Sequence, residues 1–258
     1  MKLFINLLAL LTSCHTINGQ HQLYYAPSYW ASIRLIGFID TNRVVSFDGT
    51  ARNTYFNSEL NFPQPFLEPR FQFTASYQQQ FSSKLYGLAI VSRFAERFQT
   101  LNIYRITGVH RGDILGFDFI KKISLEYWQT NYLQPKELFR IVAHAGIGKK
   151  FKKLPICINV FSALYRFSEE VQSVSPNRRR LDKTRLRIEF EYFLNAQTSI
   201  LLFAMRETDY WHQVGLYDEN GNLVSPDGNV NKIFPIYGMT MFFRFGKISS
   251  DVHINWIW

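Results

Sequence analysis

The sequence predicts an all-β protein: a closed antiparallel up-and-down transmembrane β-barrel of about 10 strands. Three observations lead to this prediction. Apolar and polar residues alternate along runs of 8 to 12 residues, and no helical periodicity is sustained. These runs match the roughly 9 to 11 residues that a tilted strand needs to cross a bilayer. The connections between the runs alternate between short and long, as turns and loops do in membrane barrels.

Alternation is clear along residues 71–78, FQFTASYQ, where aromatic residues and Ala75 alternate with polar residues. It is clearest in 184–194 and 234–245. Aromatic residues make up 17% of the chain, which favours strands and membrane interfaces. Alternation alone does not say which face is the core, because a soluble sandwich turns the apolar face inward and a membrane barrel turns it outward.

The predicted strands cover residues 30–39, 70–78, 85–94, 112–120, 122–131, 138–148, 156–166, 184–194, 199–208 and 234–245. The longest connections, 40–69 and 209–233, are expected to be extracellular loops, with Phe81 to Lys84 at a periplasmic turn. The tail at 246–258 alternates again at its end. With a partner strand from 53–62 it gives an alternative of 12 strands.

The loop pattern favours the membrane barrel, so the apolar faces should contact lipid and the polar faces should line the lumen. In residues 71–94 the lipid-facing side chains are expected to be Phe71, Phe73, Tyr77, Tyr86, Leu88 and Ile90. A barrel of this size is nearly filled by its own side chains, so charged groups should pair across it. The predicted luminal network contains Arg34, Arg93, Asp118, Glu126, Arg140, His144, Arg187, Glu189, Glu191, Arg206 and Arg244.

The chain begins MKLFINLLALLTSCHTINGQ, with a lysine, a short apolar stretch and a polar end, which is typical of a secretory signal peptide. Residues 1–19 are therefore expected to be removed, leaving residues 20–258 as the barrel. Cleavage after Gly19 is preferred, and lipoprotein processing at Cys14 is the alternative. No later segment has 18 consecutive apolar residues, so no membrane helix is expected.

The net charge of +9 comes mostly from scattered basic residues, so a nucleic-acid partner is not expected. No phosphate-binding glycine loop or zinc pattern occurs, and neither a cofactor nor a metal is predicted. Asp209 and His212, at the end of the strand 199–208, are candidates for a catalytic pair at the barrel rim, because an acid beside a histidine can activate water. A polar strand end is the preferred interpretation.

The signal peptide ending near Gln20, the alternating strands and the aromatic-rich segment IYGMTMFFRFGK (236–247) resemble small outer-membrane β-barrel proteins of Gram-negative bacteria, especially Bacteroidota. The resemblance covers nearly all of the mature chain. It implies the cell outer membrane, lipid contact and insertion by the barrel assembly machinery. The expected function is a structural barrel that binds an unknown surface ligand. A narrow porin-like channel, a rim hydrolase and a soluble periplasmic β-barrel are the alternatives.

Overall fold

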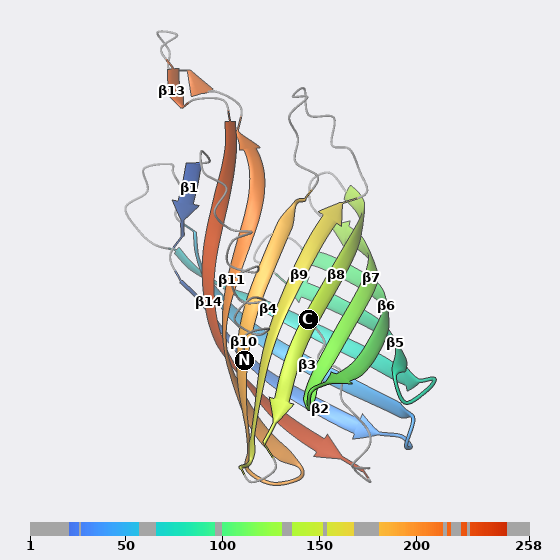
Figure 1. Cartoon of the computed structure of the whole chain (residues 1–258). Coiled ribbons are helices and arrows are strands. Elements are labelled where there is room, and N and C mark those ends of the chain that lie inside the picture. Colours follow the sequence, from blue (N-terminus) through green and yellow to red (C-terminus); the bar gives the residue numbers. More distant parts are fainter. Residues whose placement is uncertain are drawn as a thin grey trace.

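The structure, a computed structural model, describes residues 21–25, 27–56, 66–95, 100–130, 136–151, 154–167, 181–213, 216–217, 223–225 and 228–246. Its main feature is a closed barrel of eleven strands (Figure 1). These strands are β2 (Ser28–Phe38), β3 (Arg43–Phe56), β4 (Phe66–Gln80), β5 (Leu85–Ala95), β6 (Thr100–Ile114), β7 (Phe117–Thr130), β8 (Lys136–Lys150), β9 (Ile156–Phe167), β10 (Lys183–Phe193), β11 (Thr198–Gln213) and β14 (Gly228–Phe245). Strand β1 (His21–Tyr24) extends the sheet beside β14, and β12 (Leu216–Tyr217) pairs with β13 (Leu223–Ser225) in a small separate hairpin.

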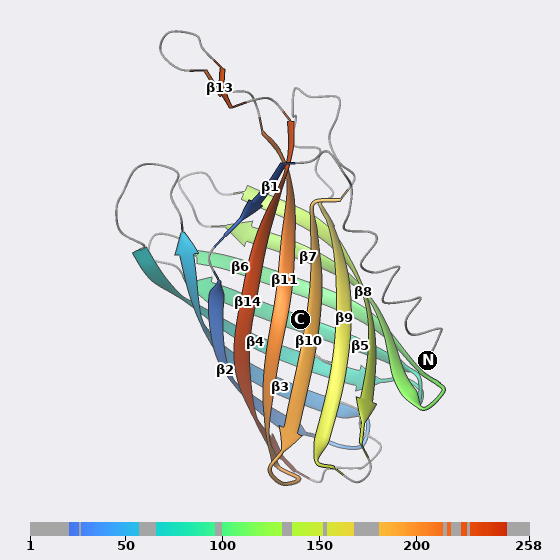
Figure 2. The ribbon, with the colours of Figure 1, turned by 60° about the vertical axis from the view of Figure 1, so that its left-hand side comes forward.

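The barrel closes through a parallel seam between its first and last strands. Each of the other ten neighbouring pairs is antiparallel, but β14 pairs with β2 in parallel, from Ile236 opposite Ser28 to Phe245 opposite Gly37. Figure 2 shows these two strands side by side. The prediction of an all-β closed barrel is confirmed, whereas the strand count of 10 or 12 and the purely antiparallel pairing are wrong. With an odd count, β2 and β14 run in the same direction.

Two regions explain the difference in strand count. Strand β3 lies within residues 40–69, which the sequence predicts to be one loop. The strand is hard to recognise because Gly49 and Ala51 interrupt the apolar residues of its outward face. The break expected at Lys121 is also wrong, since β7 continues through that residue. The chain reverses instead at Leu115 and Gly116, whose φ angles of 56° and 74° are those of a two-residue hairpin turn.

The two ends of the barrel differ in their connections. Short segments join consecutive strands at one end, called the turn end: 39–42, 81–84, 115–116, 151–155 and 194–197. The opposite end, the loop end, carries β12 and β13 (Figure 1). In the first of the turns, a side-chain hydrogen bond from Arg43 and backbone N–H donors lower the pKa of Asp40 below its ordinary value.

The outer surface of the barrel is apolar on every strand. Each barrel strand has at least one exposed large apolar side chain; in chain order these include Ile33, Phe47, Phe73, Val91, Ile106, Ile123, Ile141, Leu164, Ile188, Leu202 and Met239. Aromatic residues accompany them, and Tyr29 stacks on Tyr237 across the seam, with ring centroids 6.2 Å apart. The apolar surface therefore forms a continuous belt around the barrel.

Apolar side chains also fill part of the interior, toward the turn end. One buried cluster joins Ile36 and Val44 to Leu201 and Phe242 across the seam. A second contains Tyr86, Leu88, Ile90, Val109, Ile120 and Phe161. Tyr86, Leu88 and Ile90 were predicted to contact lipid, which is wrong. Both faces of β5 are apolar, so its pairing with β4 decides which face points inward. Leu88 lies opposite the buried Gln78, and cross-strand partners share a face.

Glycines on the inner wall allow two of these aromatic rings to lie flat against the sheet. A Cβ atom built on Gly146 would lie 2.1 Å from Cδ1 of Phe161, and one on Gly238 would lie 2.3 Å from Cζ of Phe203. Both distances are far below van der Waals contact, so no larger residue fits without moving the ring.

Among the described residues, no helix is long and apolar enough to cross a membrane. The predicted signal peptide at 1–19 and all of the tail after Gly246 lie outside the described residues.

Candidate functional site

The inner wall of the barrel carries a network of charged side chains, and this lumen is the candidate site. The structure brings most of the predicted network there. Residues on the inward faces are Arg34, Asp118, Glu126, Arg140, His144, Arg187, Glu189, Glu191 and Arg244. All of these are buried except Asp118, which is half-buried near the turn end and pairs with Arg111 at 3.4 Å.

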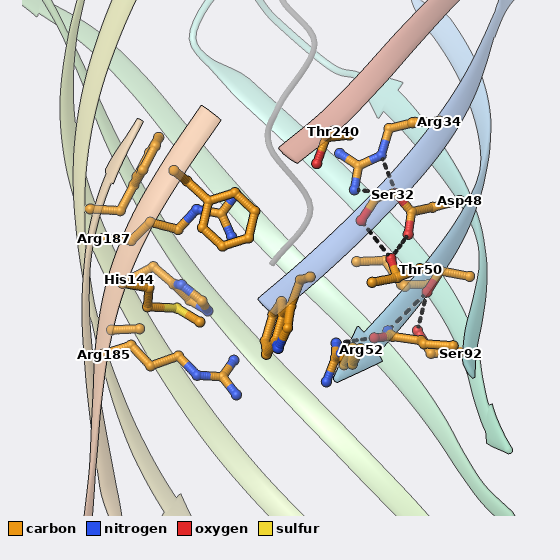
Figure 3. Close-up of a pocket in the computed structure, with 18 of the residues that line it drawn as sticks. Ser32, Arg34, Asp48, Thr50, Arg52, Ser92, His144, Arg185, Arg187 and Thr240 are labelled. Atoms are coloured by element: carbon orange, nitrogen blue, oxygen red, sulfur yellow. Dashed lines mark hydrogen bonds and ion pairs between the residues drawn. The ribbon is translucent and has the colours of Figure 1, made fainter. Parts of the chain in front are cut away.

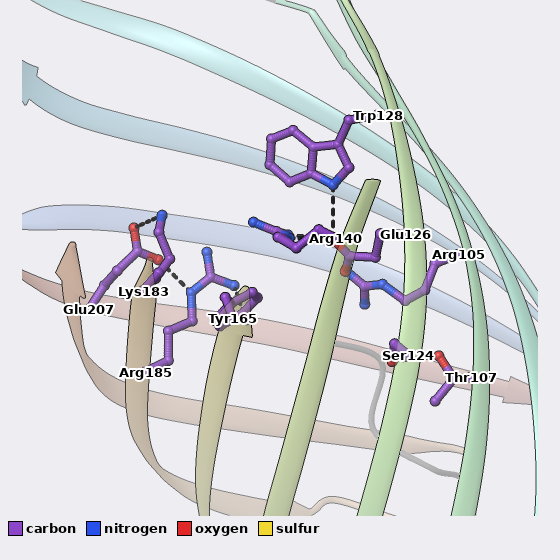
Figure 4. Close-up of polar contacts among 10 residues, drawn as sticks. All are labelled: Arg105, Thr107, Ser124, Glu126, Trp128, Arg140, Tyr165, Lys183, Arg185 and Glu207. Carbon is purple, nitrogen blue, oxygen red and sulfur yellow. Dashed lines mark hydrogen bonds and ion pairs between the residues drawn. The ribbon is translucent and has the colours of Figure 1, made fainter. Parts of the chain in front are cut away.

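Glu126 of β7 is the centre of one group, which we call the Glu126 cluster (Figure 4). Its fully buried carboxylate accepts hydrogen bonds from Arg140 Nε at 2.7 Å and from Trp128 Nε1 at 2.9 Å. Arg105 Nη2 lies 2.6 Å from the other oxygen. Arg140 also stacks on the rings of Trp128 and Tyr165, at 4.1 and 4.6 Å. The cluster thus joins strands β6 to β9 through one carboxylate.

A second group, the Glu207 cluster, lies on β10 and β11 near the loop end (Figure 4). Glu207 pairs with Lys183 at 2.7 Å and with Arg185, and Lys183 also lies 3.1 Å from Asp209. Arg185 Nη1 donates to the Tyr165 hydroxyl at 2.8 Å. Since Tyr165 also contacts Arg140, the two clusters meet at this ring.

Toward the turn end, two more ion pairs lie among the apolar side chains. Arg187 pairs with Glu189 at 2.7 Å, and its guanidinium lies 3.4 Å from the ring centroid of Phe203. Arg244 pairs with Glu191 at 2.7 Å, where Ser199 Oγ donates to the same carboxylate oxygen at 2.5 Å. Each acid has a cation beside it, as burial in a low-dielectric interior requires.

The wall formed by β2 to β5 carries polar groups that the sequence analysis did not include (Figure 3). Asp48 accepts from Arg34 Nε at 3.0 Å and from Thr50 at 2.7 Å. Arg52 donates to Gln72, which is linked through Thr74 to Ser92. Asp48 and Arg52 are absent from the predicted network because the sequence predicts a loop where β3 lies. Arg105 is absent from the predicted network because most of β6 is not among the predicted strands. For β3, the alternation of polar and apolar residues in 43–52 is the signal that could have identified the strand.

A cavity of about 80 Å³ lies between this wall and the wall of β9 to β11. It has room for several water molecules or a small solute. Figure 3 shows Arg185 and Arg187 on one side of it and Arg34 and Arg52 on the other. His144 also lines the cavity and meets the ring of Tyr165 edge-on. Opposite walls of the barrel therefore present their guanidinium groups to the same space.

Two members of the predicted network are not in the lumen. Arg93 lies opposite Phe73, and Arg206 lies opposite Leu186, both on the outward face. Their charge suggested an inward position, but strand pairing decides the face. Both residues lie in the half of their strand toward the loop end, where a long arginine side chain can extend along the apolar surface to water.

The predicted catalytic pair is not assembled by the described side chains. Asp209 lies on the inner wall and pairs with Lys183. His212 belongs to β11, opposite Asn229, but its side chain lies outside the described residues. Within the described part of the chain, no group of three or more His, Cys, Asp or Glu residues could hold a metal ion.

Comparison with known proteins finds similarity in architecture only. No family model matches the chain, and the search of curated proteins found no match. Among solved structures, LpxR from Salmonella typhimurium is similar with a TM-score of 0.47 and 9% identity, covering 81% of this chain and 86% of that one. A NanC porin structure is similar with a TM-score of 0.46 and 10% identity, covering 85% and 100% of the two chains. Similarity at this level assigns neither a family nor an activity.

Proposed function

We propose that the chain is an integral outer-membrane barrel that acts as a structural or surface-binding protein and not as an open pore. The observation that carries the proposal is the inverted distribution of polarity. Every barrel strand exposes a large apolar side chain outward, whereas paired carboxylates such as Glu126 and Glu189 are fully buried inside. Soluble monomers rarely expose apolar patches beyond a few hundred Å², so a continuous apolar belt calls for lipid.

The interior supports a closed lumen. Eleven strands make a barrel closer in size to the eight-stranded barrels that side chains fill than to the porins of about 16 to 18 strands, which leave an aqueous channel. Toward the turn end, buried apolar clusters fill the lumen in addition to the ion pairs. A ligand would therefore reach the protein from the loop end, at its surface or in the cavity.

Location is tested by fractionation of expressing cells, together with gel mobility before and after boiling in detergent. We expect the protein in the outer-membrane fraction, with an unboiled band that migrates differently from the boiled one, because a closed barrel resists detergent until heated. A soluble periplasmic protein without this mobility shift would refute the membrane assignment and favour the soluble barrel.

Occlusion is tested by recording current across planar bilayers that contain the purified protein. We expect no regular single-channel steps, because ion pairs and apolar clusters of the described residues occupy the lumen. A narrow channel is the second candidate, and the arginine-lined cavity favours it. Stable steps with a preference for anions would establish that alternative and overturn the closed barrel.

A further inference from the structure

More basic than acidic side chains line the cavity inside the barrel. Five arginines line it (Arg34, Arg52, Arg105, Arg185 and Arg187), whereas Asp48 is its one lining carboxylate. That carboxylate is already bound by Arg34 and Thr50. Arg105, Arg185 and Arg187 pair with acids that lie outside the cavity lining, Glu126, Glu207 and Glu189. Arg52 is the one lining arginine that has no ion pair among the described residues, so the excess positive charge of the cavity lies at that side chain. A solute that enters the cavity meets donors from both walls.

Three buried donor atoms at this cavity have no acceptor among the described residues. They are Nε1 of Trp30, Nη1 of Arg34 and Nε of Arg52. All three residues line the cavity and come from the adjacent strands β2 and β3. Trp30 and Arg52 lie directly opposite each other, whereas Arg34 lies four residues further along β2, opposite Asp48. Indole and guanidinium groups donate hydrogen bonds and accept none, so a group that serves Trp30 and Arg52 must carry acceptor oxygens.

Arg52 is held in a fixed orientation beside these donors. Its guanidinium carbon lies 3.9 Å from the ring centroid of Trp30 and 4.9 Å from that of Phe94. Its hydrogen-bond partner, Gln72, is neutral, and no carboxylate among the described residues pairs with it. A planar cation stacked on an aromatic ring keeps its edge available for a planar or tetrahedral oxyanion.

We propose that this cavity binds a small oxyanion, of the size of inorganic phosphate or a short carboxylate, with Arg52 and the Trp30 indole as donors. The cavity volume of about 80 Å³ fits such a solute. The polar walls, including Thr50, Ser92 and Thr240, add hydroxyl groups around it. The proposal goes beyond the proposed function, and binding can be measured in detergent whether or not the barrel conducts current.

The test is calorimetric titration of the folded full chain in a non-ionic detergent with inorganic phosphate, at constant ionic strength. We expect saturable binding at one site, competition by sulfate and no competition by choline. The variant Arg52→Gln should weaken binding by about tenfold or more, since it removes a charged donor. The matched control, Arg93→Gln, removes an exposed arginine from the outward face and should leave the affinity unchanged.

Folding of each variant is checked by the heat-dependent gel shift, so loss of the barrel is distinguishable from loss of the site. If Arg52→Gln does not fold, Trp30→Phe replaces it: the ring under Arg52 stays and the indole donor goes, with an expected weakening of about fivefold. Absence of saturable phosphate binding, or equal affinity in the wild type and in the folded cavity variants, overturns the proposal.

Discussion

Replacement of Glu126 by leucine is expected to lower the free energy of unfolding by about 3 to 5 kcal/mol, the range for a buried ion pair that loses one partner. The fully buried carboxylate accepts from Arg140 and Trp128 and lies 2.6 Å from Arg105. Leucine has a similar volume but no acceptor, so two buried cations would lose the charge that balances them. Urea unfolding of the protein in lipid vesicles, followed by tryptophan fluorescence, measures the change.

Two controls separate charge from shape at this position. Glu126→Gln keeps the size and one acceptor oxygen, and should lie between the wild type and the leucine variant. Asp40→Asn breaks an exposed ion pair with Arg43 in a turn, and should leave the unfolding midpoint nearly unchanged. An unfolding midpoint for Glu126→Leu equal to that of the wild type would show that the cluster does not stabilise the barrel.

The second large effect is expected from Gly146→Ala. The added Cβ would lie 2.1 Å from Cδ1 of Phe161, so the ring must leave its place in the inner apolar cluster. Overpacking of this kind costs about 1 to 3 kcal/mol. The same vesicle-based unfolding experiment measures it, and a slower appearance of the heat-resistant gel band should accompany the loss.

A matched glycine is available in the neighbouring part of the barrel. Gly108 of β6 is exposed, and a Cβ atom added there meets nothing within 4 Å, so Gly108→Ala should be neutral or slightly stabilising. Phe161→Leu should partly rescue Gly146→Ala, since a smaller side chain leaves room for the methyl group. Equal effects of the two glycine substitutions, or the absence of rescue, would contradict the packing argument.

The sequence predicts the barrel class and the faces of its clearest strands, because alternation is a local property. In β10, Glu189 and Glu191 alternate with exposed Ile188 and Phe190, and both observations follow from the amino acids alone. In β5 both faces are apolar, so alternation gives two equivalent solutions, and only pairing with β4 selects one. The charge of Arg93 predicts the wrong face of β5, because the pairing of this strand with β4 places Arg93 on the outward face.

The cavity and its lining residues cannot be predicted from the sequence. Arg52 and Arg185 belong to strands that are far apart in the chain and face each other across the lumen. Which residues meet there depends on the number of strands and on their stagger around the barrel. An error of one strand, such as the omission of β3, changes every contact across the interior while leaving each local pattern intact.

The parallel seam imposes an order on assembly. Ten of the strand pairings join consecutive barrel strands and can form one after another, as each new strand adds to a growing sheet. The eleventh, between β14 and β2, joins the first and last barrel strands and has the largest sequence separation of the eleven. Until it forms, both sheet edges present unpaired N–H and C=O groups, which an apolar environment cannot satisfy. In the outer-membrane barrel that we propose, formation of this single pairing is therefore the step that removes the last unpaired edges of the barrel.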